Sequence, residues 1–133
     1  MYILFDIGGT KTRVAFSPDL HTFEQPIKYD TPPEYHNGLM ALTNAIESVV
    51  KGRKITAIAG GIRGPLNHEK TGIVSEVVLR DWVGRKITDD LTKKFKVPAY
   101  LENDTAIVGL GEVAFGAGKG YDIVAYHTVS TGV

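Results

Sequence analysis

The chain has 133 residues, 43% of them hydrophobic, which is enough to bury one core of ordinary size and predicts a single domain. Its 15 basic and 15 acidic residues cancel, so the net charge gives no reason to expect nucleic acid or a membrane as a partner. The absence of cysteine excludes disulfides and thiol chemistry, and with no leader and no long apolar segment we expect a cytoplasmic protein.

The first part of the chain predicts three antiparallel strands. Residues 2–5 and 12–16 are short β-prone runs, and the pair Gly8-Gly9 between them is typical of a tight turn. Residues 23–29 can supply the third strand, so we expect the sheet to begin with consecutive antiparallel neighbours.

A helix and a buried strand are expected next. Apolar residues recur at helical spacing after Pro32-Pro33, which suits the start of a helix, and Gly52 suits its end. Residues 55–59 are a compact apolar run followed by Gly60-Gly61. This pattern predicts a buried strand that ends in a loop at the glycine pair.

The second half of the chain predicts another helix and another strand. Thr88, followed by Asp89 and Asp90, is expected to cap a helix that stops before Pro98. Residues 100–102 would then form a short strand.

The last predicted helix begins near Asn103, and residues 116–120 are glycine-rich and should end it. One apolar face is formed by Ala106, Ile107, Leu110, Val113 and Ala114. Residues 123–129 are expected to form one more strand. Together these elements predict an α/β layer whose mixed sheet has three antiparallel strands, followed by alternating helices and strands.

Residues 6–12 read Asp-Ile-Gly-Gly-Thr-Lys-Thr and combine groups that suit a bound phosphate. Glycine lets backbone N–H groups approach an anion closely, while Thr10 can donate a hydrogen bond and Lys11 can offset charge. Asp6 can hold Mg²⁺ through water. The same residues also suit a plain hairpin turn with exposed polar flanks, so this segment does not decide the matter by itself.

A second polar group, Glu102-Asn103-Asp104, stands where a predicted strand passes into a helix. Open α/β sheets bind ligands at the carboxyl ends of their strands, which is where these side chains would project. Asn103 can exchange hydrogen bonds with a sugar hydroxyl, and Asp104 can accept the proton of a hydroxyl that attacks a phosphoryl group. The alternative is a helix N-cap, a position that Asn and Asp favour for reasons unrelated to catalysis.

These segments together resemble the ROK sugar kinases, a family named for repressor, open reading frame and kinase. Residues 6–11 resemble its first phosphate motif, residues 61–65 its sugar-side glycine loop, residues 102–104 its substrate motif and residues 130–132 its second phosphate loop. The resemblance covers the whole chain in the family's order. It implies a ribonuclease H-like lobe of the actin-like ATPase superfamily and ATP-dependent phosphorylation of a hexose or hexose derivative, as in glucokinase.

The resemblance also implies roles for single residues. Asp104 would be the catalytic base and would contact the substrate, and Asn103 would contact a sugar hydroxyl. Further substrate contacts are implied for Gly64, Pro65 and Glu102. The residues implied to bind ATP are Asp6, Gly8, Gly9, Thr10, Lys11, Thr131 and Gly132. Asp6 would also bind Mg²⁺.

By the same resemblance, residues 1–118 form the N-terminal lobe, and residues 119–133 form a linker and the first strand of a second lobe. ATP and the sugar would bind between the lobes, so these residues alone should be inactive, and the full-length protein should be a homo-oligomer. One alternative is a sugar-responsive repressor, against which the lack of an N-terminal DNA-binding module and of basic charge argue. Another actin-like enzyme and a non-catalytic sugar-binding or regulatory paralogue are further alternatives.

Three residues bear on substrate choice. Arg63 stands where the family often has proline, and it either adds a cation near the sugar or faces solvent. Val78 stands where a sugar-binding asparagine is frequent, so a hydroxyl contact would be lost. Trp82 is expected to pack in the core rather than to stack on a ligand.

The histidines show no metal-ligand spacing and are interpreted as ordinary polar residues.

Overall fold

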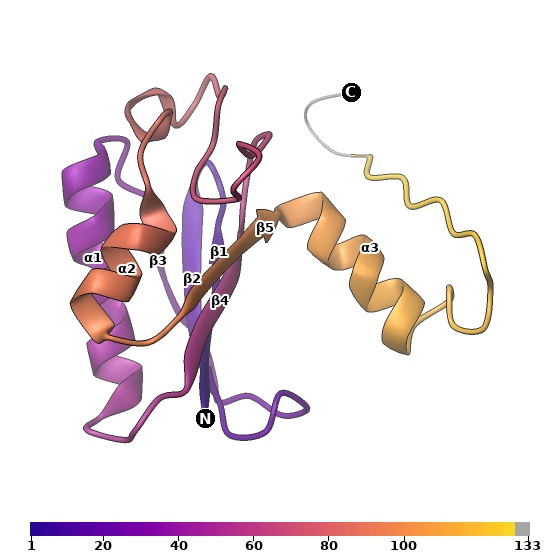
Figure 1. Cartoon of the computed structure of the whole chain (residues 1–133), viewed down its shortest axis with the longest axis horizontal. Helices are drawn as coiled ribbons and strands as arrows, with labels where there is room; N and C mark the ends of the chain where they lie inside the picture. The colour runs from indigo at the N-terminus through magenta and orange to yellow at the C-terminus, as the bar shows by residue number, and fades with distance from the viewer. Residues whose placement is uncertain (130–133) are drawn as a thin grey trace.

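The computed structural model describes residues 1–129, which form one mixed five-stranded sheet with helices on both sides (Figure 1). The strands are β1 (Tyr2–Ile7), β2 (Lys11–Ser17), β3 (Ile27–Asp30), β4 (Ala57–Ile62) and β5 (Ala99–Asn103). They lie in the order β3-β2-β1-β4-β5. The pairs β1–β2 and β2–β3 are antiparallel, whereas β4 and β5 are parallel to β1. The predicted mixed sheet is therefore confirmed.

Helices α1 (Tyr35–Val50) and α2 (Ile87–Phe95) lie on one side of the sheet, with the short 3-10 turn η1 (Arg80–Trp82) before α2. Helix α3 (Asp104–Phe115) follows β5 directly and extends away on the other side (Figure 1). Within residues 1–129, no helix combines the length and the apolar character that crossing a bilayer requires.

The core lies between the sheet and the pair α1 and α2. Side chains alternate along β1, so that Ile3, Phe5 and Ile7 are buried against these helices. Trp82 is 1% exposed and packs edge-on against Tyr35, with ring centroids 5.2 Å apart. A packing role for Trp82, rather than a stacking platform, is thereby confirmed.

The glycine pair after the fourth predicted strand does not end that strand. Strand β4 runs through both residues to Ile62. A Cβ on Gly60 would lie 2.3 Å from the carbonyl oxygen of Phe5. Gly60 is therefore needed for close packing of β4 on β1, and the prediction of a loop beginning there was wrong.

Two further boundaries differ from the prediction. Helix α2 begins at Ile87 after an N-cap at Lys86, and Thr88 is buried within its first turn instead of capping it. Residues 123–129 form no strand in the structure. A strand needs a hydrogen-bonding neighbour, and no strand within residues 1–129 pairs with this segment. The short third strand, β3, is confirmed but covers only the last part of the predicted run.

Candidate active site

The carboxyl ends of β1, β4 and β5 bring the two polar motifs to the same edge of the sheet. In the strand register, Asp6 lies opposite Gly61, and Gly61 lies opposite Glu102. Because the three strands are parallel to one another, these residues form a row across one face of the sheet. The expectation that both motifs meet at one edge is met by this arrangement.

Gly61 lets the start of α3 approach β4 closely. A Cβ on Gly61 would lie 3.3 Å from the Cα of Asp104 and 3.2 Å from Cδ1 of Ile107. Asp6 and Asp104 consequently line one cavity of about 390 Å³. The cavity is completed by Leu4, Phe5, Ala59, Gly60, Gly61, Ile107 and Val108. Two carboxylates from distant parts of the sequence thus share one site with apolar walls.

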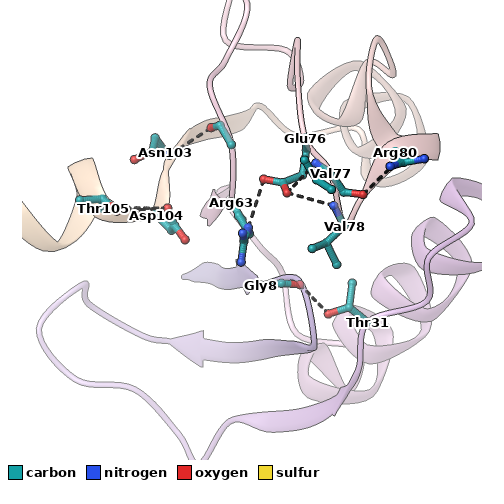
Figure 2. A network of polar contacts seen from close by, with 11 residues as sticks. Gly8, Thr31, Arg63, Glu76, Val77, Val78, Arg80, Asn103, Asp104 and Thr105 are labelled. Atoms are coloured by element: carbon teal, nitrogen blue, oxygen red, sulfur yellow. Dashed lines mark hydrogen bonds and ion pairs between the residues drawn. The ribbon is translucent and has the colours of Figure 1, made fainter. Parts of the chain in front are cut away.

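Asp104 stands in the first turn of α3 (Figure 2). Its Oδ1 accepts a hydrogen bond from the backbone N–H of Thr105 at 2.8 Å. Among residues 1–129, Oδ2 makes no hydrogen bond, so one carboxylate oxygen is left to accept a proton.

The side chain of Asn103 caps α3 and also binds the segment that follows β4. Its Oδ1 accepts from the backbone N–H of Ala106 at 3.2 Å, as the N-cap alternative predicted. Its Nδ2 donates to the carbonyl oxygen of Gly64 at 3.0 Å. Gly64 has a positive φ of 107°, which favours glycine. The side chain of Asn103 therefore holds residues 63–65, which follow β4, beside the start of α3.

Glu102 is bound to the preceding loop through Lys70. The Lys70 ammonium, and after it the backbone N–H of Asn103, lower the pKa of Glu102 below its usual value. Glu102 is therefore a carboxylate at neutral pH that already has a cationic partner, and the ion pair ties Lys70, in the loop after β4, to the end of β5.

The hairpin between β1 and β2 is closed by backbone bonds. The N–H of Gly8 donates to the carbonyl oxygen of Lys11 at 3.0 Å, and the Thr31 hydroxyl donates to the carbonyl oxygen of Gly8 at 2.8 Å (Figure 2). The carbonyl oxygen of Thr10 accepts from the backbone N–H of Thr31 at 2.9 Å. A Cβ on Gly9 would lie 3.2 Å from Cγ1 of Val78. The turn is thus rigid and has little room for side chains.

The charged residues of the hairpin form ion pairs within the hairpin and with β3. Nη1 of Arg13 lies 2.8 Å from Oδ2 of Asp6, and Lys11 pairs with Asp30. These side chains are largely exposed, and exposed ion pairs contribute less than about 1 kcal/mol, so an anionic ligand can displace them.

Asp6 is the one acidic residue within β1, β2 and the turn that joins them. Within residues 1–129, no group of three or more His, Asp or Glu side chains could hold a metal. Arg13 binds only Oδ2 of Asp6, so among residues 1–129 the Oδ1 atom has no ion-pair partner and could contact a Mg²⁺ ion. Thr131 and Gly132, the other predicted nucleotide contacts, lie outside the described residues.

One polar cluster was missed by the sequence analysis. The Glu76 carboxylate is only 8% exposed and accepts hydrogen bonds from the N–H groups of Val77 and Val78 and from Nε of Arg63, at 2.8, 3.1 and 3.1 Å. Burial alone would raise the pKa of Glu76, but these N–H groups and the Arg63 guanidinium together lower it. Arg63 is therefore held in place, although half its side chain reaches solvent.

Comparisons with known proteins agree with this fold. A sequence profile of the ROK family matches residues 2–133. The glucokinase of Streptomyces coelicolor is 27% identical over 128 residues, which are 96% of this chain and 40% of that protein. The xylose repressor of Bacillus subtilis is 32% identical over 53 residues, which are 40% of this chain and 14% of the repressor.

A solved structure supports the same assignment. The ROK family glucokinase from Streptomyces griseus, in complex with glucose and AMPPNP, matches with a TM-score of 0.81 and 26% identity, over 91% of this chain and 38% of that one. The chain thus has the predicted ribonuclease H-like fold of actin-like ATPases. It spans about 40% of the length of the curated glucokinases that it matches. With a family profile that matches nearly every residue, the chain belongs to the ROK family.

Proposed function

We propose that this chain is the first lobe of an ATP-dependent kinase that phosphorylates a hydroxyl of a hexose or hexose derivative. The observation that carries the proposal is the cavity in which Asp6 and Asp104 meet across Gly61. The Streptomyces griseus glucokinase complex with glucose and AMPPNP supports a sugar and ATP as the two ligands.

Asp104 acts as the base in this proposal. The sugar hydroxyl oxygen bonds to the terminal phosphorus, the bond from that phosphorus to the bridging oxygen breaks, ADP leaves, and Asp104 takes the hydroxyl proton. Such transition states are loose, so an ordinary carboxylate in the right position is sufficient. The backbone N–H and the hydroxyl of Thr105 both donate to Oδ1 of Asp104, which orients the carboxylate and leaves its second oxygen for this proton.

The hairpin is the nucleotide side of the proposed site. Gly9, Thr10 and Lys11 would contact the ATP phosphates together with Gly8, although the Gly8 N–H is already bound within the turn. Asp6 would hold Mg²⁺, which neutralises charge on the phosphates when it is bound.

Residues 61–65, at the end of β4 and just after it, and the end of β5 are the sugar side. Asn103 can add a sugar contact only through the second N–H or the second lone pair of its amide, because both atoms already have protein partners. Gly64, Pro65 and Glu102 would shape the rest of this side. The Val78 side chain has no hydrogen-bonding group at the position where an asparagine is frequent in the family, so the sugar specificity should differ from that of glucokinase.

We further propose that residues 1–118 are one lobe and that residues 119–133 lead into a second one, with Thr131 and Gly132 in a facing phosphate loop. Helix α3 supports this proposal. Most of its side chains are apolar, yet residues 1–129 bury none of them. A further part of the protein that covers α3 would bury them. A homo-oligomer and the absence of nucleic acid partners belong to the same proposal.

The test is Asp104→Asn in the full-length protein, assayed for sugar-dependent ADP release against hexoses, amino sugars and N-acyl sugars. Removing a general base should lower kcat by a factor of about 10² to 10⁴ without weakening ATP binding. Asp89→Asn is the matched control, because Asp89 also stands in the first turn of a helix but lies on α2. Turnover by Asp104→Asn at the control's rate would refute the assignment.

The second candidate is a sugar-responsive regulator, and the observation behind it is the match to the xylose repressor over 40% of this chain. A protein that binds a sugar from the panel but releases no ADP would support the regulator and contradict the kinase.

A further inference from the structure

Arg63 is held beside the hairpin by the strand pairing that precedes it. It follows β4 directly, and its backbone N–H donates to the carbonyl oxygen of Ile7 at 3.0 Å, which continues the pairing of β4 with β1. A Cβ on Gly9 would lie 3.6 Å from Cδ of Arg63. The arginine side chain therefore passes alongside the turn that the proposed function assigns to phosphate.

Glu76 determines which part of the guanidinium is free to bind. It accepts from Nε of Arg63, while two backbone N–H groups fix the carboxylate from the other side (Figure 2). Among residues 1–129, neither Nη1 nor Nη2 of Arg63 donates a hydrogen bond. The guanidinium is thus anchored at one edge, and its two terminal nitrogens are left as donors.

The charges of this cluster favour an anion as the ligand of Arg63. The Glu76 carboxylate is nearly buried and already accepts three hydrogen bonds. The group of this ion pair that faces solvent is therefore the Arg63 guanidinium. Two parallel N–H donors of a guanidinium match two oxygens of a phosphoryl group, which an ammonium cannot reproduce.

The neighbours of Arg63 favour the nucleotide over the sugar. Gly9 is flanked by the apolar Val78 and by the Arg63 side chain, so Arg63 is the polar group on that side of the turn. The sugar side is formed by Asn103 and Gly64, which are already joined by a hydrogen bond of 3.0 Å.

We propose that Arg63 binds the terminal phosphoryl group of the nucleotide as that group is transferred, and that Glu76 is the positioning residue for Arg63. This inference rests on the proposed kinase function, and it assigns to Arg63 the neutralisation of charge that develops on the equatorial phosphoryl oxygens.

The experiment compares the affinities of AMPPNP and ADP by calorimetry in the full-length protein, because these ligands differ in the terminal phosphoryl group. Arg63→Met should weaken AMPPNP by about tenfold, the loss of one charge-assisted contact, and leave ADP within about twofold. Arg80→Met is the matched control, because Nε of Arg80 binds the nearby carbonyl oxygen of Val77, and it should change neither affinity.

Two further variants keep the test decisive. Arg63→Lys retains the positive charge but lacks the two parallel N–H donors of the guanidinium, so it should lose part of the AMPPNP preference. It serves as the test even if Arg63→Met fails to fold. Glu76→Gln leaves the Arg63 side chain in place but removes its anionic partner, and should lower the AMPPNP preference by about threefold with an unchanged ADP affinity.

An AMPPNP-to-ADP affinity ratio that stays unchanged in both Arg63 variants would overturn the inference. Weaker sugar binding at a constant ratio would also overturn it, and would assign Arg63 to the sugar. A wild-type protein that turns over no sugar would contradict the proposed function, but the affinity ratio would still decide the role of Arg63. Kinase activity with an unaffected ratio would leave the proposed function intact and reject Arg63.

Discussion

The face of the sheet toward α1 and α2 is closed by packing, whereas the face toward α3 is open. Ile3, Phe5 and Ile7 point into the closed face and are almost fully buried. On the open face, Asp6 and Gly61 line a cavity beneath α3, and Phe115 at the end of that helix is 80% exposed. One face holds the fold together, and the other carries the proposed site.

This division has a physical reason. Apolar side chains at alternating strand positions stabilise the fold in proportion to the area they bury, so one face of β1 is committed to the core. The remaining positions of the same strand are free to carry a carboxylate at the carboxyl edge. If the division is real, equal substitutions on the two faces should have unequal consequences.

Glycine-to-alanine exchange in two helices gives the largest expected contrast. A Cβ on Gly38 in α1 would lie 2.0 Å from Cζ2 of the buried Trp82, so Gly38→Ala should destabilise by about 1 to 3 kcal/mol. Gly111 in α3 has no atom within 4 Å of such a Cβ, so Gly111→Ala should stabilise by up to about 1 kcal/mol through helix propensity. Denaturant unfolding of the 133-residue chain measures both. Changes of the same sign would argue against the contrast.

Gly61→Ala is the corresponding change on the open face. The added Cβ would press on Asp104 and Ile107 at 3.3 and 3.2 Å, and α3 can yield because none of its residues is buried. The fold should therefore lose little stability, but displacement of Asp104, the proposed base, should lower kcat of the full-length protein by about tenfold. Normal turnover by a stable Gly61→Ala protein would show that the spacing between β4 and α3 does not matter for catalysis.

The sheet and the meeting of Asp6 with Asp104 were predictable because both follow from local rules. Strand periodicity and the glycine turn identify the strands, and the carboxyl ends of parallel strands must share an edge. The N-cap at Asn103 was likewise an open alternative from the sequence, and the structure adds the bond to Gly64 that the sequence could not indicate.

The remaining features depend on contacts that leave no sequence pattern. Glu76 and Arg63 are 13 residues apart on an irregular loop, where no periodicity places one side chain beside another. Gly60 was interpreted as a loop residue because a glycine needed for close packing looks the same in sequence as a glycine that turns the chain. Residues 123–129 have the composition of a strand, but pairing requires a neighbour that composition does not supply.

The acid dependence of stability should depend on Glu76. Its pKa is lowered from the usual 4.5, so its carboxylate stabilises the fold above that pH and the contribution is lost as the pH falls through the lowered value. Glu76→Gln should be less stable than the wild type by about 1 kcal/mol at neutral pH, and this difference should shrink in acid because Gln does not titrate. Thermal unfolding from neutral to acid pH checks this, and a constant difference would contradict it.

The smallest effect is expected for the ion pair of Arg13 with Asp6. These side chains are 49% and 44% exposed, so Arg13→Met should lower the free energy of unfolding by less than about 1 kcal/mol. The difference should vanish at high salt, because screening weakens exposed pairs but leaves apolar packing intact. Urea unfolding at low and high salt measures it. A loss as large as that for Gly38→Ala would mean that the open face contributes to the fold as strongly as the core does, and the separation of stability from chemistry between the two faces would fail.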